Sequence, residues 1–111
     1  MNRIDWGYYK RHIPNKVQVA PKVFYEVFWT DEFVASDNLG ETRYSERQII
    51  IKKKMSNKLT VVTYIHELVH AMSYEHGMNL TEAQVLSSES FFMYLLKDGN
   101  IFKAKGKKKN E

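Results

Sequence analysis

Two histidines and a glutamate near the middle of the chain have the spacing of a metal-binding motif. His66, Glu67 and His70 form the pattern HExxH. Residues i and i+4 of an α-helix share a face, so both imidazoles can bind one cation. Glu67 is rotated by about 100° from His66, which places its carboxylate outside the ligand set but beside a zinc-bound water. Because zinc makes that water acidic, the three residues predict a catalytic zinc site with Glu67 as general base.

The neighbours of the two histidines favour this interpretation over ordinary surface histidines. His66 and His70 lie beside an apolar stripe formed by Val62, Ile65 and Val69. Imidazoles without a partner would be poorly placed beside such a stripe. We therefore expect both side chains to be metal ligands.

A catalytic zinc site normally has three protein ligands, so a third residue is required. The chain has no cysteine, which leaves histidine and carboxylate side chains. Glu89 is the predicted third ligand, because it falls on the core-facing stripe of the next predicted helix at nearly the level of His70. Glu82, at the start of that helix, is one alternative. His76 is the other: it has the metzincin spacing, but an unbroken helix would turn it about 240° away from His70.

The elements that must position these residues are a small sheet and two helices. Residues 1–22 are predicted to be an irregular N-terminal segment with one short helix. Val23 to Trp29 alternates in the manner of a half-buried strand. Residues 44–54 contain Ile49, Ile50 and Ile51, which predict a second strand. The short connection between the two strands predicts an antiparallel sheet.

After Ser56 the apolar residues recur at helical spacing, and Ser56 or Asn57 can cap the start of this helix. Gly77 is placed to end it in the left-handed conformation. Thr81 to Gln84 matches a capping box that starts a second helix, which Gly99 would close. A short connection makes the two helices an antiparallel hairpin. The predicted fold is therefore α+β, with a small antiparallel sheet packed on a helical hairpin that carries HExxH.

Length, composition and charge limit the remaining possibilities. The 111 residues fit one domain, predicted to span 1–102. The formal charge of +4 comes from residues 103–111, a lysine-rich segment expected to be a disordered tail, whereas residues 1–102 carry equal numbers of basic and acidic side chains. The lysines at 52–54 are expected to form a charged strand edge. Nucleic acid and membrane are therefore not expected as partners, and a cytoplasmic location is expected because no signal or membrane-spanning segment is evident.

Residues 63–71, which include HExxH, and residues 80–85 resemble the short metallopeptidase-like proteins of phages and prophages. They are more distantly similar to the peptidase domain of the ImmA/IrrE group, which cleaves repressors. An HExxH helix followed by a glutamate on the next helix is the gluzincin arrangement. The resemblance implies a minimal zincin-like fold, a bound zinc ion, and an edge strand that binds the substrate as an added strand. Gln48 to Lys54 would be that strand.

The resulting hypothesis is a zinc-dependent metallopeptidase that hydrolyses peptide bonds in a protein or peptide substrate. The alternative is a catalytically silent, metal-stabilised interaction module, such as an anti-repressor or host-factor binder. Glu67 favours the enzyme, because a purely structural zinc site has no need of that carboxylate. Tyr64, Tyr74 and Tyr94 are candidates for stabilising the oxyanion.

Overall fold

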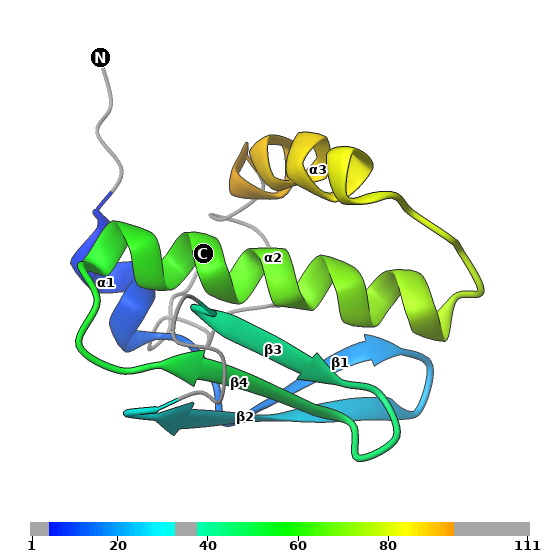
Figure 1. Ribbon diagram of the computed structural model, residues 1–111, viewed down its shortest axis with the longest axis horizontal. Helices are drawn as coiled ribbons and strands as arrows, with labels where there is room; N and C mark the ends of the chain where they lie inside the picture. Colours follow the sequence, from blue (N-terminus) through cyan, green and yellow to red (C-terminus); the bar gives the residue numbers. More distant parts are fainter. Residues whose placement is uncertain (1–4, 33–37, 95–111) are drawn as a thin grey trace, which may run out of the picture.

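The computed structural model describes residues 5–32 and 38–94, and for residues 89–94 only the backbone. The fold is α+β, as predicted. Its elements are, in chain order, α1 (Trp6–Arg11), β1 (Lys16–Ala20), β2 (Val23–Thr30), β3 (Gly40–Arg43), β4 (Gln48–Lys52), α2 (Asn57–Glu75) and α3 (Glu82–Tyr94). Figure 1 shows α2 lying across one face of the sheet, with α3 on the far side of α2.

The sheet is mixed, in the order β1-β2-β4-β3, and the prediction of a purely antiparallel sheet is wrong. Strands β1 and β2 are antiparallel, as are β3 and β4, but β2 and β4 are parallel. Strand β3 and the turn at residues 44–47 that joins it to β4 are not predicted from the sequence. Because the chain reverses direction twice between β2 and β4, β4 returns parallel to β2.

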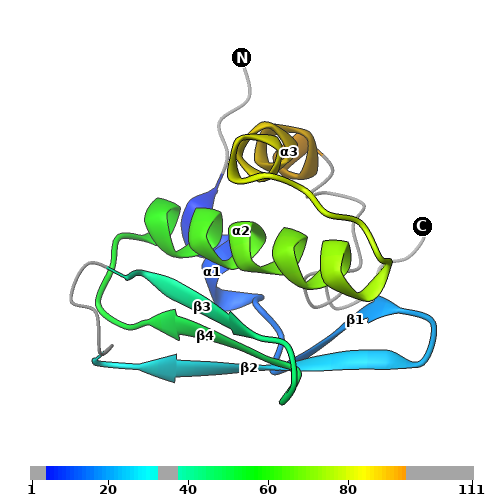
Figure 2. The same ribbon diagram turned by 45° about the vertical axis from the view of Figure 1, so that its right-hand side comes forward.

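The same strand order corrects the position predicted for residues 48–54. Strand β4 is paired on both sides, with β2 and with β3, so it is an internal strand. Lys52 is its last residue, and Lys53 and Lys54 follow it. These lysines are therefore not a strand edge, and it is β3 that lies at the border of the sheet next to α2. Figure 2 shows β3 running below α2.

The N-terminal segment is more regular than expected. The predicted short helix is α1, but residues 16–20 form a strand that the sequence analysis missed. Val17 and Val19 are both 3% exposed, whereas Lys16 and Gln18 face solvent. This alternation is short, yet it has the period of two that identifies a half-buried strand.

The core lies between the sheet and α2. Tyr25 and Val27 point inward from β2, as the alternation predicts, while Phe24, Glu26 and Phe28 point outward. Burying a large apolar side chain contributes about 1.5–3 kcal/mol, so the apolar stripe of α2 determines how the helix is rotated on the sheet. The fully buried members of this core include Tyr25, Ile49, Ile51, Val61, Tyr64, Ile65 and Leu68.

Both helix boundaries that matter for the site have the predicted caps. The Ser56 hydroxyl accepts a hydrogen bond from the Leu59 amide at the start of α2. At its end, Gly77 has a φ of +71°, and the amide of Met78 donates to the carbonyl of Ser73, which is the pattern of a Schellman motif. The chain therefore turns sharply after α2.

The predicted capping box starts α3. The Gln84 amide donates to the Thr81 hydroxyl at 3.1 Å, and the Thr81 amide donates to the Gln84 side-chain oxygen at 2.8 Å. Because this box fixes the first turn of α3, it also fixes the position of Glu82, the first residue of that helix.

In the described ranges, 5–32 and 38–94, no helix has the length and apolar character needed to cross a membrane. The predicted end of the second helix at Gly99 and the predicted boundary between a domain, 1–102, and a tail, 103–111, lie outside the described residues.

Candidate metal centre

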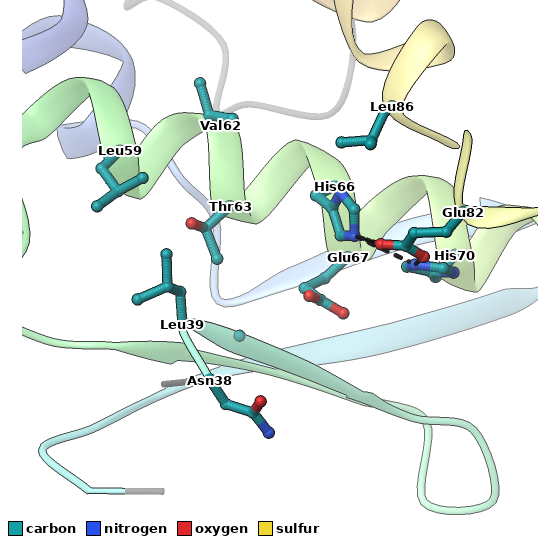
Figure 3. Close-up of a pocket in the computed structure, with 11 residues that line it drawn as sticks. Asn38, Leu39, Leu59, Val62, Thr63, His66, Glu67, His70, Glu82 and Leu86 are labelled. Atoms are coloured by element: carbon teal, nitrogen blue, oxygen red, sulfur yellow. Dashed lines mark hydrogen bonds and ion pairs between the residues drawn. The ribbon is translucent and has the colours of Figure 1, made fainter. Parts of the chain in front are cut away.

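Three side chains meet where the middle of α2 faces the start of α3. The Nε2 atoms of His66 and His70 lie 3.3 Å apart. Each faces one oxygen of the Glu82 carboxylate, at 2.8 Å from His66 and 3.1 Å from His70. Figure 3 shows the two rings and the carboxylate pointing toward one another. This group of three residues could hold a metal ion.

The geometry of the three ligand atoms fits a small tetrahedral cation. Zinc binds histidine nitrogen at about 2.0–2.1 Å, and two ligands of a tetrahedral ion at that distance are about 3.3 Å apart. The two Nε2 atoms have this separation. Two neutral imidazoles and one carboxylate would also leave one position open, as in catalytic rather than structural zinc sites.

The third member of the group is Glu82, which the sequence analysis had kept as an alternative to Glu89. The side chain of Glu89 lies outside the described residues, so that prediction is not tested. Glu82 reaches the histidines because the Schellman turn and the capping box reverse the chain within residues 76–81. Glu82 lies next to this turn, and that position brings its carboxylate to His70.

His76 has a different role from the one that metzincin spacing would give it. It lies at the C-cap of α2. Its Nε2 atom lies 2.9 Å from the carbonyl oxygen of Val19. Since a carbonyl only accepts, the ring nitrogen donates this bond and ties the end of α2 to β1.

Glu67 lies beside the group, between α2 and β3. The hydroxyl of Thr42 on β3 is 2.7 Å from Glu67 Oε1 and 3.0 Å from the Glu67 carbonyl oxygen. Burial raises the pKa of the Glu67 carboxyl, and the hydrogen bond from Thr42 opposes this increase. The carboxylate is therefore held in place without being one of the three candidate ligands.

Gly40 allows β3 to pass close to α2 at this point. A Cβ atom at position 40 would lie 2.7 Å from Thr63 Cγ2 and 3.0 Å from Glu67 Cγ, which is closer than ordinary packing permits. The sequence analysis did not identify Gly40 or Thr42 as site residues. The HExxH motif does not indicate which strand lies beside its helix. The pattern of residues 40–43 by itself does not predict a strand at this position.

The candidate centre opens into a groove of about 450 Å³. One end carries the candidate metal ligands and Glu67, and the other is apolar, with Leu39, Leu59 and Val62 (Figure 3). Leu59 is 39% exposed and Leu86 on α3 is 55% exposed. The groove as a whole is lined by Asn38, Leu39, Gly40, Leu59, Val62, Thr63, His66, Glu67, His70, Glu82 and Leu86.

Two of the tyrosines proposed to stabilise the oxyanion, Tyr64 and Tyr74, have side chains that the structure describes. Tyr64 is fully buried in the core, so it is not available to a substrate. Tyr74 stacks on Tyr44, with ring centroids 4.4 Å apart, and the side chain of Tyr94 lies outside the described residues. Burial raises the pKa of Tyr44, and the charges of Glu67 and Glu82 raise it further. Tyr44 is thus a phenol within electrostatic reach of the site that the sequence analysis missed.

Comparisons of this chain with protein-family models, with curated proteins and with solved structures found no match. The geometry of the site is therefore the basis for assigning a function.

The hydrogen bond from Thr42 leads to a first prediction. In metal-free protein, Thr42→Val should lower the free energy of unfolding by about 1–2 kcal/mol, because the half-buried Glu67 carboxylate loses its donor. The pKa of Glu67 is raised on folding, so its ionisation costs stability as pH rises through that value. Thr42 reduces this cost, so the loss should be larger at neutral than at acidic pH.

Urea unfolding at the two pH values measures this difference. Thr42→Ser, which keeps the hydroxyl, is the matched control. Equal losses in the valine and serine variants would show that the hydrogen bond does not stabilise Glu67.

Proposed function

We propose that this chain is a zinc-dependent metallopeptidase in which His66, His70 and Glu82 hold the ion and Glu67 is the general base. The observation that carries the proposal is the division of roles among the four side chains. Three of them converge on one point, while the fourth is half-buried next to them and held by a different element. The proposal also keeps the zincin-like helical hairpin that the sequence predicts.

The chemistry follows from what each side chain can do. A bound zinc ion would supply Lewis acidity to the carbonyl of the substrate and to an attacking water. Glu67 accepts the proton of that water and can deliver it to the amine that leaves. Burial raises the pKa of the Glu67 carboxyl toward the range in which one group can both accept and release a proton near neutral pH.

The substrate strand proposed from the resemblance must be reassigned. Residues 48–54 cannot take an added strand along β4, because β4 is paired on both sides. Strand β3 ends the sheet in the described part of the chain and passes directly beside Glu67. We infer that an extended peptide pairs with β3 and places a carbonyl beside the candidate ligands.

The apolar end of the groove favours peptides with an apolar side chain. Leu39, Leu59 and Val62 form a surface next to the polar centre, and burying an apolar side chain there contributes binding free energy. A peptide with a large apolar residue near the scissile bond is therefore the expected substrate. The observation that favours an enzyme over a silent interaction module is the half-buried Glu67 carboxylate, held by Thr42 beside the candidate ligands, which a metal-stabilised module would not need.

Zinc-loaded protein incubated with a mixed peptide library, followed by mass spectrometry, tests this function. We expect cleavage next to large apolar residues, loss of cleavage on addition of a chelator, and recovery with added zinc. Protein that contains one zinc ion per chain and cleaves no peptide would refute the proposal and favour the interaction module.

A further inference from the structure

A second pocket lies toward the other end of α2 from the metal centre. It has a volume of about 530 Å³, and the described residues that line it are Gly7, Lys10, Arg11, Trp29, Lys53 and Asn57. Asn57 precedes His66 by nine residues, or about 14 Å along the helix. No acidic side chain is among these described lining residues, so the pocket is basic.

The basic side chains of this region come from three segments of the chain. Lys10 and Arg11 are on α1, Lys53 follows β4, and Lys58 is on α2. None of them forms an ion pair among the described residues. The Lys10 ammonium donates to the Met55 carbonyl, and that of Lys58 lies over the ring of Trp6.

The acidic residues near the pocket are too few to neutralise its cations. The Asp5 Oδ1 atom lies 3.6 Å from the position of a Cβ atom on Gly7, and it already accepts a hydrogen bond from the Tyr8 amide at the cap of α1. Asp31 and Glu32 follow β2, and no described ion pair joins either of them to a lysine or arginine. Cations that outnumber the nearby carboxylates repel one another, and an anionic ligand relieves that repulsion.

The shape of the pocket suits a phosphate group. A Cβ atom on Gly7 would lie 3.2 Å from Asn57 Nδ2, 3.3 Å from Arg11 Nη1 and 3.6 Å from Asp5 Oδ1. Two hydrogen-bond donors therefore converge over a residue that has no side chain, beside one carboxylate oxygen. Guanidinium and amide groups both donate to phosphate oxygens, and Trp29 supplies an aromatic wall on which a base can stack.

We propose that this pocket binds the backbone of a single nucleic-acid strand, independently of the metal centre. A lone phosphate would be satisfied by two or three cations, whereas three cationic side chains line the pocket and that of Lys58 lies outside it, over the ring of Trp6. The total charge does not predict nucleic-acid binding, because residues 1–102 are neutral overall. Binding of a polyanion depends on how charges are distributed, and the fold gathers distant cations on one surface.

Fluorescence anisotropy with a labelled single-stranded oligonucleotide, at several salt concentrations, tests the proposal on the full chain. Arg11→Gln combined with Lys53→Gln should weaken binding roughly tenfold at low salt and reduce the slope of log K against log salt by about 1.4, since two cations are removed. Lys16→Gln combined with Lys22→Gln removes the same charge from β1 and the following turn, and leaves the lysines at 103–111 intact. This control should weaken binding by less than about twofold.

A second variant keeps every charge and fills the pocket. Gly7 does not have a positive φ, so Gly7→Leu suits the helix backbone, while its side chain displaces the Arg11 and Asn57 donors, which lie 3.3 and 3.2 Å from the Cβ position. We expect it to weaken binding as the double variant does. Equal weakening by the two charge pairs, full binding by Gly7→Leu, or equally tight binding of polyglutamate would overturn the proposal.

Discussion

Replacing Glu82 by alanine is expected to lower the affinity for zinc by at least about 100-fold, because only two protein ligands remain where a catalytic zinc site has three. Both oxygens of Glu82 lie within about 3 Å of the histidine nitrogens, so the alanine variant loses the one carboxylate among the three candidate ligands. Competition with a chromogenic chelator measures the affinity. Bound zinc should also raise the melting temperature of the wild type and raise that of the variant much less.

The matched comparison is Glu89→Ala, which removes a carboxylate from the same helix. It should change the zinc affinity by less than about threefold. His70→Ala serves as the positive control, and it should lose the metal as Glu82→Ala does. If Glu89→Ala alone released zinc, the prediction from the sequence would be correct and the ligand set proposed from the described residues would be wrong.

Glu67→Gln should leave one zinc ion bound per chain but lower the rate of peptide hydrolysis by about 10²–10⁴-fold. Glutamine keeps the size of the side chain and can still accept the hydrogen bond of Thr42. It cannot accept the proton of the attacking water, so only the chemical step is affected. The rate is measured on a peptide identified with the library, at saturating zinc.

Glu75→Gln is the control for this variant, because it makes the same chemical change on the same helix. Glu75 accepts a hydrogen bond from the Tyr25 hydroxyl and lies near Arg47, where it ties α2 to the sheet. It should affect stability more than the rate. Wild-type activity in Glu67→Gln would show that Glu67 is not the base, and equal loss of activity in both variants would show that the loss is structural.

Local sequence patterns determined the helix that carries the chemistry. The spacing of His66 and His70, the cap at Ser56 and the left-handed Gly77 each depend on interactions within a few residues. The same is true of the capping box at Thr81 and Gln84. Such patterns can be recognised in the sequence because the atoms that satisfy one another are neighbours along the chain.

The order of the strands could not be predicted in this way. The alternation of Val23 to Trp29 shows which face of β2 is buried, but not which strand lies beside it. Strand β3 has no apolar alternation of its own, and its edge position comes from pairing with β4. For the same reason the contacts of Gly40 and Thr42 with Glu67 could not be foreseen, since they join residues about 25 positions apart.

Local sequence patterns could not decide which residue is the third candidate ligand. The sequence determined that α2 would be followed by a second helix carrying Glu82 and Glu89, and that each could face α2. Which carboxylate meets His66 and His70 depends on the path of residues 76–81 and on how far α3 is displaced along α2. A difference of seven residues along a helix is about 10 Å. Only the tertiary structure decided that Glu82 lies at the histidines, because the turn geometry and the packing of the two helices together set that displacement.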